Sequence, residues 1–143
     1  MLVTGVDVIE IERIGRIAGL YKDRFFNRIY TSRELIYCNN RINQLSTRFA
    51  AKEAVMKALG TGTTVNWKDI EVTRNPGEAP QILLHGKAKI HAFKNNINNL
   101  SVSLSHSREF AIAVVVGTIA SVTGFKTHAL LAVFYKGLIG SQI

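Results

Sequence analysis

The stretch Arg48-Phe-Ala-Ala-Lys-Glu-Ala-Val-Met-Lys-Ala-Leu-Gly60 decides the fold, because it predicts one helix that is apolar around nearly its whole circumference. A helix of this kind is normally buried. Buried charges are rare unless they are paired or bound to a ligand. The charged residues of this stretch are Arg48, Lys52, Glu53 and Lys57. Ser46 or Thr47 can cap the start of the helix, and the run Gly60-Thr61-Gly62 provides its end.

Glu53 and Lys57 stand four residues apart in this helix, so their side chains project from nearly the same face. A carboxylate beside an ammonium group suits a metal ion that is bound together with a phosphate. The alternative is an ordinary helical ion pair, which contributes only ~0.3–0.5 kcal/mol when it is exposed. The spacing alone leaves both interpretations open.

A second acid lies near the N-terminus, where residues 2–9 have the β-branched composition of a buried strand. Asp7 interrupts this apolar run at or near the end of the strand, where open sheets commonly place binding groups. Asp7 and Glu53 can supply two carboxylates to one magnesium ion, with the phosphates of a substrate completing its oxygen shell. The alternative is that Asp7 caps the following helix, which is expected from Ile9 to about Ala18.

The charge of the chain is strongly basic and unevenly placed. The 143 residues suit a single domain and carry a net charge of +8. Eight basic residues occur between positions 13 and 48, against only Asp23 and Glu34. Such a surface favours an anionic partner, which can be a nucleic acid, an acidic protein or a phosphorylated cofactor. A basic face that is merely solvated is the alternative.

The cysteine count and the first residues indicate a cytoplasmic protein. Cys38 is the one cysteine, so the chain has no internal disulfide and fits a reducing compartment. Asp7 and Glu10 come too early for a signal peptide. Residues 110–125 carry no charge over 16 positions, which is short of the ~20 that span a bilayer. We therefore expect a cytoplasmic location and no membrane partner.

The remaining pattern predicts an α+β fold. Thr31 and Glu34 match a capping box that opens a helix running to about Asn39. Further elements are expected as strands at 69–73, 81–84, 100–105 and 110–116 and as a helix at 86–96. Turns at 75–77 and 106–109 join the strands into hairpins. Helices grouped between antiparallel strands imply an antiparallel sheet packed against the helix of residues 48–60.

The last hairpin contributes a third candidate site. Ser103, Ser105 and Ser107 alternate with other residues and give the strand one face that bears hydroxyl groups, and His106 lies beside the turn. Hydroxyls and a histidine at such a place can hold phosphate oxygens. The alternative is that the serines are only solvated and that His106 is structural.

Four blocks in register carry a resemblance to a known family. They lie at residues 5–14, 48–62, 67–71 and 103–107, and the Phe-Ala-Ala-Lys-Glu sequence of the second block is highly specific. From about residue 2 to residue 117 the chain resembles holo-acyl-carrier-protein synthase, the small bacterial type of 4′-phosphopantetheinyl transferase. The resemblance implies an α+β fold that commonly assembles as a homotrimer with active sites between neighbouring subunits.

The resemblance also implies a reaction. Enzymes of this family move the 4′-phosphopantetheine arm of coenzyme A onto a serine of apo-acyl carrier protein in fatty acid biosynthesis, and they release adenosine 3′,5′-bisphosphate. By match, Asp7 and Glu53 would ligate Mg2+, and Lys57 would meet the pyrophosphate. The serine proton would go to Glu53 or to a water on the metal, although Asp7 is a further candidate.

Other residues are assigned to binding by the same resemblance. The nucleotide end of coenzyme A, with its 3′-phosphate, would lie against Arg48, Gly60, Gly62, Pro80, Ser105 and His106. Arg13, Arg24 and Arg28 would face the acidic helix of the carrier protein. Chains of this family usually finish near Gly117, so we expect a transferase domain at residues 1–117 and an extension of unknown role at 118–143.

Two other functional classes share part of this pattern. A basic nucleic-acid-binding module would use the same charged surface, but the aromatic residues are not interleaved with it in a stacking pattern. A magnesium-dependent phosphohydrolase would share the two carboxylates and Lys57. Neither class explains the ordered set of four blocks, so we expect no nucleic acid as partner.

Overall fold

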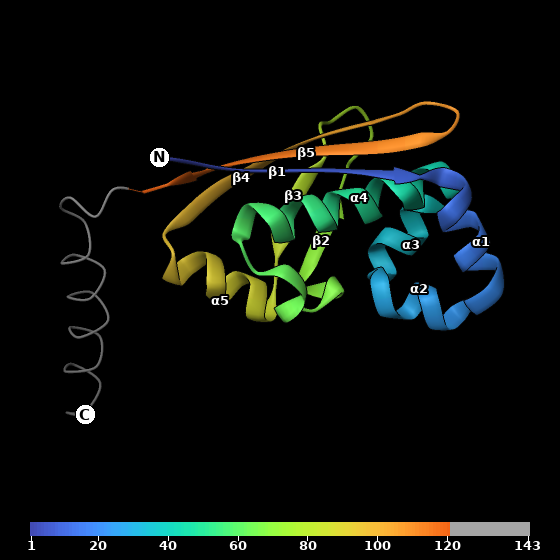
Figure 1. Cartoon of the computed structure of the whole chain (residues 1–143), viewed down its shortest axis with the longest axis horizontal. Coiled ribbons are helices and arrows are strands. Elements are labelled where there is room, and N and C mark those ends of the chain that lie inside the picture. Colours follow the sequence, from blue (N-terminus) through green and yellow to red (C-terminus); the bar gives the residue numbers. More distant parts are fainter. Residues whose placement is uncertain (121–143) are drawn as a thin grey trace, which may run out of the picture.

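Within residues 1–120, five strands form one antiparallel sheet in the order β1-β5-β4-β3-β2 (Figure 1). The computed structural model describes residues 1–120. The strands are β1 Leu2–Glu10, β2 Ile70–Thr73, β3 Gln81–Leu84, β4 Ile97–His106 and β5 Phe110–Ile119. The three long strands, β1, β5 and β4, lie side by side, with Asp7 and Leu104 both opposite Ala113.

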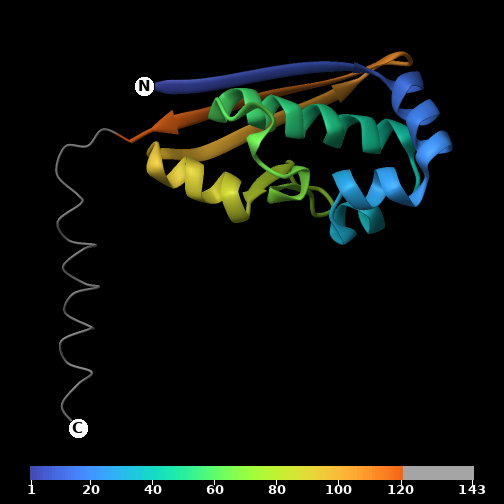
Figure 2. The same ribbon diagram turned by 60° about the horizontal axis from the view of Figure 1, so that its bottom comes forward.

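The helices cover one face of this sheet (Figure 2). They are α1 Ile11–Tyr21, α2 Asp23–Ile29, α3 Ser32–Cys38, α4 Ile42–Leu59 and α5 Gly86–Lys94, with short 3-10 turns η1 Gly62–Thr64 and η2 Trp67–Asp69. The longest is α4, with 18 residues, and it packs mainly against β1 and β5. None of the helices within residues 1–120 is both long and apolar enough to cross a membrane.

Small residues on the covered face let α4 approach the sheet closely. Ala111 and Ala113 of β5 are fully buried beneath the helix layer. Gly5 of β1 is required by the same approach, because a Cβ at this position would lie 1.9 Å from the carbonyl oxygen of Ala54 on α4. The strand that carries Asp7 is therefore pressed directly onto the helix that carries Glu53.

The opposite face of the sheet is not covered by any element of residues 1–120. Side chains alternate along the strands, so each buried residue of β1 and β5 is followed by an exposed one. The exposed residues of these two strands are mostly apolar, and they include Val6, Val8, Ile112, Val114 and Val116.

The structure confirms the α+β class and corrects several boundaries. α4 begins at Ile42, not at Ser46 or Thr47, which are buried inside the helix instead of capping it. The capping box of Thr31 and Glu34 is confirmed at the start of α3. The helix expected from Ile9 begins at Ile11, and α2 was not anticipated.

The two ends of the last hairpin also differ from expectation. β4 begins at Ile97 and includes His106, so the turn to β5 starts one residue later than predicted. β5 continues to Ile119, past the expected domain boundary at Gly117. Residues 121–143, which form most of the expected extension, lie outside the described part of the chain.

Candidate active site

Asp7 lies in the middle of β1 with its side chain turned toward α4. Its side chain is 9% exposed, and its Oδ1 accepts a hydrogen bond of 2.8 Å from Nζ of Lys57. The same Nζ donates to the carbonyl oxygen of Val6 at 2.8 Å. The residue that precedes α1 is Glu10, which makes no side-chain cap. The alternative interpretation, in which Asp7 caps the following helix, is therefore wrong.

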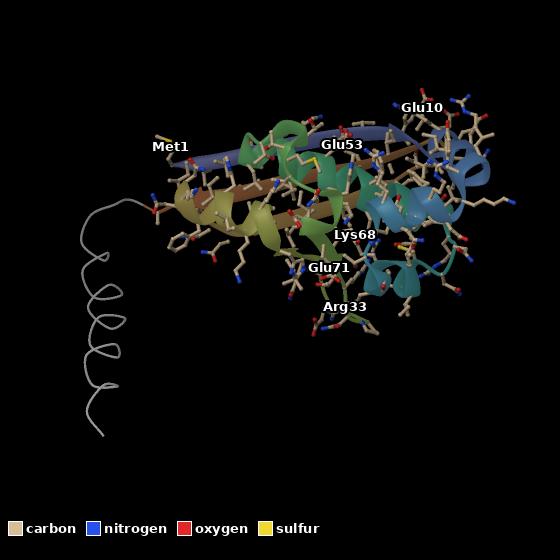
Figure 3. The ribbon with its side chains drawn as sticks, turned by 90° about the horizontal axis from the view of Figure 1, so that it is seen from below. Met1, Glu10, Arg33, Glu53, Lys68 and Glu71 are labelled. Atoms are coloured by element: carbon tan, nitrogen blue, oxygen red, sulfur yellow. The ribbon has the colours of Figure 1, made fainter. Side chains whose placement is uncertain are left out.

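Glu53 is half-buried on α4, and Figure 3 shows it beside β1. Burial, followed by the negative charge of Asp7, raises the pKa of Glu53, while the positive charges of Lys57 and Arg13 act in the opposite direction. Two acids and two bases from β1, α4 and α1 thus lie close together. The ion pair of Lys57 is formed with Asp7 and not with Glu53, so the simple helical pair considered above is not the one found.

The oxygens of this cluster suit a hard cation. Oδ2 of Asp7 is buried and has no hydrogen-bond partner, which is costly for a carboxylate unless a ligand is bound there. Magnesium prefers carboxylate oxygens and usually keeps several ligands from water or substrate phosphates. No group of three or more His, Cys, Asp or Glu side chains within residues 1–120 could hold a metal. Asp7 and Glu53 therefore fit an ion that takes its remaining ligands from a substrate.

Arg48 occupies a different part of α4. Five residues before Glu53, it projects about 140° away around the helix axis. It is almost fully buried, with Nη1 donating to Oε1 of Gln44 at 2.6 Å and the guanidinium 4.6 Å from the ring centre of Tyr37. Nε and Nη2 have no partner. Within one chain Arg48 does not join the Asp7–Glu53 cluster.

Ser105 and His106 also lie apart from that cluster. The register of β1, β5 and β4 puts the Cα of His106 about 12 Å from that of Asp7. Both residues are exposed, and Nδ1 of His106 lies 3.2 Å from the carbonyl oxygen of Ser107. Ser105 faces the uncovered side of the sheet, because it is opposite the exposed Ile112.

Gly60 and Gly62 follow α4, whereas Pro80 lies in a different part of the structure, before β3. Gly60, with a φ angle of 68°, is the left-handed residue that ends α4 after Leu59, and Gly62, with a φ angle of 54°, begins η1. Pro80 precedes β3, half-buried, at the end of the sheet where Gln81 pairs with Thr73. No hydrogen bond within residues 1–120 links Pro80 to Asp7 or Glu53.

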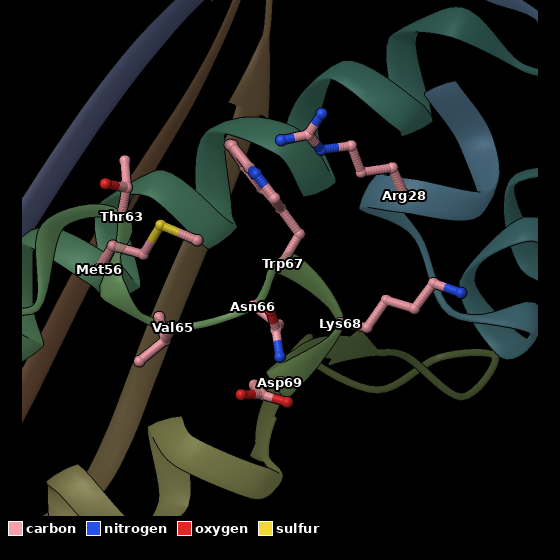
Figure 4. Close-up of a pocket in the computed structure, with 8 residues that line it drawn as sticks. All are labelled: Arg28, Met56, Thr63, Val65, Asn66, Trp67, Lys68 and Asp69. Carbon is pink, nitrogen blue, oxygen red and sulfur yellow. The ribbon is translucent and has the colours of Figure 1, made fainter. Parts of the chain in front are cut away.

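The three arginines expected at a protein partner lie on α1 and α2, and all are exposed. Arg13 is close enough to Glu53 to influence its pKa. Arg28 lines a cavity of about 420 Å3 between α2, α4 and the η1–η2 segment (Figure 4). The other lining residues are Met56, Thr63, Val65, Asn66, Trp67, Lys68 and Asp69. Asp7, Glu53 and Lys57 are not among the residues that line this cavity.

Comparison with known proteins identifies the family. Residues 4–115 match the model of the 4′-phosphopantetheinyl transferase superfamily. The chain belongs to this superfamily. The holo-[acyl-carrier-protein] synthase of Dehalococcoides mccartyi is 47% identical over 116 residues, which cover 81% of this chain and 98% of that protein. The synthase of Koribacter versatilis is 42% identical over 121 residues, covering 81% of this chain and 97% of that protein.

Solved structures of the phosphopantetheinyl transferase superfamily share the fold. The holo-[acyl-carrier-protein] synthase of Helicobacter pylori, solved in complex with coenzyme A, matches with a TM-score of 0.74 at 35% identity, covering 80% of this chain and 99% of that one. The synthase of Neisseria meningitidis matches with a TM-score of 0.74 at 30% identity, covering 81% and 97%. The resemblance inferred from the four sequence blocks is confirmed.

One buried feature of this phosphopantetheinyl transferase fold was missed by the sequence reasoning. Lys52 and Glu34 have fully buried side chains and form an ion pair of 2.8 Å between α4 and α3. Burial lowers the pKa of Lys52, and the charge of Glu34 opposes this shift. The sequence indicated that Lys52 needed a partner, but it contains no local signal that would have selected Glu34.

A second set of side-chain contacts continues this network toward the surface. The hydroxyl of Thr31 donates to Oε1 of Glu71 at 3.0 Å, and Oε2 of Glu71 lies 2.9 Å from Nε2 of His85. Burial raises the pKa of Glu71, but the hydrogen bonds from His85 and Thr31 outweigh it, so the net shift is downward. These contacts join α3 to β2 and to the start of α5.

Proposed function

We propose that the chain is a holo-[acyl-carrier-protein] synthase, which transfers the 4′-phosphopantetheine arm of coenzyme A to a serine of apo-acyl carrier protein and releases adenosine 3′,5′-bisphosphate. The observation that carries the proposal is the pairing of Asp7 with Glu53 beside Lys57, with one buried carboxylate oxygen left without a partner. The relatives with this name match over nearly their whole length, which supports it. We assign the activity to residues 1–117.

Asp7 and Glu53 would hold a magnesium ion in this reaction. When bound, magnesium supplies a positive charge that offsets the negative charge developing on the phosphates during transfer. Lys57 adds a second positive charge beside the carboxylates, because its ammonium group pairs with Asp7. Its side chain is 54% exposed, so a substrate can reach it. It can therefore donate to an oxygen of the leaving α-phosphate and stabilise the charge there.

The proton of the attacking serine needs an acceptor within hydrogen-bond distance. Asp7 is engaged by Lys57, whereas no ion pair within residues 1–120 engages Glu53. Glu53 is thus the freer of the two carboxylates. We assign it the serine proton, which it would take directly or through a water molecule.

The nucleotide end of coenzyme A would be held by residues that lie apart in one chain. Arg48 points away from the Asp7–Glu53 cluster of its own chain, as the helix phase requires, and His106 lies on the same face of the sheet as Asp7 but about 12 Å from it. A homotrimer with sites between subunits would let one subunit offer the acids and its neighbour the nucleotide contacts. The uncovered apolar face of β1 and β5 supports such an assembly. Gly60, Gly62, Pro80 and Ser105 would complete the nucleotide contacts.

Arg48 must become accessible before it can reach a phosphate. Its two unpartnered nitrogens are buried beneath Tyr37 and Gln44. Displacement of either side chain would expose a guanidinium edge, whose planar donors suit two oxygens of a 3′-phosphate. The same unpartnered nitrogens would then be satisfied by the ligand.

The carrier protein would dock on the exposed face of α1 and α2. Arg13, Arg24 and Arg28 provide positive charge there, and Arg13 lies near Glu53, so a serine on an acidic partner is directed toward the cluster. Opposite charges also accelerate encounter at low ionic strength. The single cysteine, Cys38, is buried and reduced, which is compatible with the cytoplasm, where such a reaction would take place.

Mass spectrometry of the carrier protein tests this proposal. Apo-acyl carrier protein incubated with coenzyme A, Mg2+ and the wild-type chain should gain the mass of one phosphopantetheine group. Glu53→Ala should give no gain while keeping the fold, because Glu53 is half-buried and contributes no ion pair. Glu78→Ala, in the exposed turn before β3, is the matched control and should retain the activity. A normal mass gain with Glu53→Ala would remove Glu53 from the mechanism.

A further inference from the structure

The ammonium group of Lys52 is held by three oxygens from three different elements. Nζ lies 2.8 Å from Oε2 of Glu34 on α3, donates to the carbonyl oxygen of Trp67 on η2 at 3.1 Å, and donates to the carbonyl oxygen of Ile70 on β2. An ammonium group has three donors, so all of them are engaged. The side chain has no exposed surface, so these three oxygens take the place of water around its charge.

Glu34 is fixed just as firmly on the other side of the pair. Its Oε1 accepts from the backbone nitrogen of Val72 at 2.9 Å, and its Oε2 accepts from the backbone nitrogen of Thr31 at 2.8 Å. The carboxylate therefore cannot swing to follow Lys52 if α4 rotates. The pair therefore connects α4 to a carboxylate that is itself fixed by backbone nitrogens of Thr31 and Val72.

Two adjacent contacts then determine the direction of Glu53. Successive residues of a helix point about 100° apart, so the bound direction of Lys52 sets that of its neighbour. On the other side of Glu53, the carbonyl oxygen of Ala54 is pressed against Gly5 of β1, two residues before Asp7. Glu53 is thus bracketed by two fixed points and is directed toward Asp7.

Stability alone does not account for this buried ion pair. Transferring two charges out of water is costly, and buried pairs can often be replaced by apolar residues without loss of stability. An apolar side chain would fill the same space, but it would not impose directional bonds on three elements. Compared with an apolar replacement, the ion pair therefore contributes directional bonds between α4 and its neighbouring elements.

We infer that Lys52 is a positioning residue for the Asp7–Glu53 pair: its bonds to Glu34, Trp67 and Ile70 set the rotation of α4 that aims Glu53 at Asp7. The inference rests on the proposed function, because it concerns the two carboxylates assigned to magnesium. Trp67, whose carbonyl oxygen accepts from Lys52, also lines the cavity between α2, α4 and the η1–η2 segment.

The test compares three variants with the wild-type chain. Lys52→Met removes the ammonium and leaves Glu34 unpaired. The double variant Lys52→Met/Glu34→Gln removes both charges and keeps an acceptor for the backbone nitrogen of Val72, which restores stability if the unpaired charge was the only defect. Ile97→Ala makes a cavity in the same core at the far end of β4 and is the control for a general loss of stability.

Two readouts are measured at a temperature where each variant is folded by circular dichroism. Calorimetric titration with Mg2+ should show affinity weakened about 10–100-fold in Lys52→Met and in the double variant, because supporting residues of this kind contribute that much. The kcat of carrier-protein modification should fall by a similar factor, while KM for the carrier protein stays unchanged. Ile97→Ala should retain both wild-type values despite its lower melting temperature.

Several outcomes would overturn the inference. If the double variant recovers wild-type magnesium affinity and kcat together with stability, then Lys52 is needed only for folding. The same follows if Ile97→Ala loses affinity and kcat as strongly as Lys52→Met. If instead the wild-type chain does not modify the carrier protein at all, the proposed function fails, and the magnesium titration alone decides the positioning role.

Discussion

Asp7 and Glu53 bring two carboxylates together at the junction of β1 and α4, and the negative charge of Asp7 disfavours the ionised form of Glu53. Burial and this repulsion raise the pKa of Glu53, and Lys57 and Arg13 offset only part of the shift. Groups arranged for a ligand commonly reduce the stability of the free protein. The site therefore has a stability signature that can be measured without any substrate.

Replacing Glu53 should stabilise the chain at neutral pH. Because the folded-state pKa of Glu53 is raised, the native state binds its proton more tightly than the unfolded state does, and the free energy of unfolding falls as pH rises through the interval between the two pKa values. Glu53→Gln removes the ionisable group and with it this fall in the free energy of unfolding. We expect its melting temperature to exceed that of the wild type at pH 7, with the difference vanishing well below pH 4.5, the ordinary pKa of the group.

Scanning calorimetry from pH 3.5 to pH 8 measures this difference. Glu78→Gln, at an exposed turn, is the matched control and should follow the wild type across the range. A Glu53→Gln variant that is less stable than the wild type at pH 7 would show that the attraction of Lys57 and Arg13 outweighs burial and the repulsion from Asp7.

Single residues differ in how far the sequence predicts their roles. Asp7 and Glu53 were expected at one site because each is an acid inside an apolar run, and burial of such a group demands a partner. The partner of Lys52 could not be predicted, since Glu34 is 18 positions away and meets it only through the packing of α3 on α4. Arg48 was predicted to hold a nucleotide, but nothing local indicated its contact with Tyr37.

At the scale of elements, the contact of β1 with α4 depends on one glycine. A Cβ on Gly5 would meet backbone atoms of α4, which cannot move aside as a flexible side chain would. We expect Gly5→Ala to separate the strand from the helix, to cost about 3 kcal/mol or more of unfolding free energy, and to weaken magnesium binding by moving Asp7 away from Glu53. Urea unfolding and magnesium calorimetry measure the two effects.

Gly19→Ala is the control for this substitution. Gly19 lies inside α1 with no atom within 4 Å of its added Cβ, so alanine should raise the free energy of unfolding by about 0.5–1 kcal/mol. Wild-type stability in Gly5→Ala would mean that β1 and α4 are farther apart than described.

The helices α1 and α2 form the element proposed to meet the carrier protein. Arg13→Glu combined with Arg24→Glu reverses two exposed charges there, and we expect carrier-protein binding to weaken about tenfold or more at low ionic strength. Binding of coenzyme A should change much less. Calorimetry with each ligand compares the two effects, and the loss for the carrier protein should shrink in 0.5 M salt because screening removes long-range attraction.

A charge-matched control separates docking from net charge. Arg74→Glu with Lys94→Glu changes the total charge equally on exposed segments away from α1 and α2. This pair should leave carrier-protein binding near the wild-type value. Equal losses for both ligands in the Arg13 and Arg24 variant would reject the docking assignment.

Element boundaries were predicted where a local signal dominates and missed where tertiary packing does. The capping box at Thr31 is a local device, and α3 begins there as expected. Ser46 and Thr47 have the side chains of good caps, but both are buried in α4, whose first turn packs against the small core around Tyr30 and Leu45. That packing extends the helix back to Ile42 and overrides the capping preference of Ser46.

At the scale of the whole molecule, the helices of residues 1–120 lie on one face of the sheet only. An antiparallel sheet can face water on one side, but its exposed positions are then usually polar. Here β1 and β5 expose a row of apolar side chains, of which Val6, Val8 and Val114 are 52%, 54% and 42% exposed. A contiguous apolar face of this kind is typical of an interface. This pattern could be read from the alternation of the strands only once their pairing was known.

Val114→Lys should therefore prevent the proposed assembly of subunits. Val114 pairs with Val6 and Ser103 across the sheet and points away from the core, so the substitution leaves the packing of α4 intact. In an assembly it would bury an unpaired charge, which is strongly unfavourable. We expect light scattering after gel filtration to give a trimer mass for the wild type and a monomer mass for the variant, with unchanged circular dichroism.

The activity of the monomer then tests whether the site is shared between subunits. If Arg48 and His106 of a neighbour hold the nucleotide, monomeric Val114→Lys should lose affinity for coenzyme A while its own Asp7 and Glu53 still bind Mg2+. Ile36→Lys places the same charge at another exposed apolar residue, on α3, and should remain assembled and active. A Val114→Lys monomer with wild-type coenzyme A affinity would show that one chain contains a complete site, and a monomeric wild type would remove the assembly from the proposal.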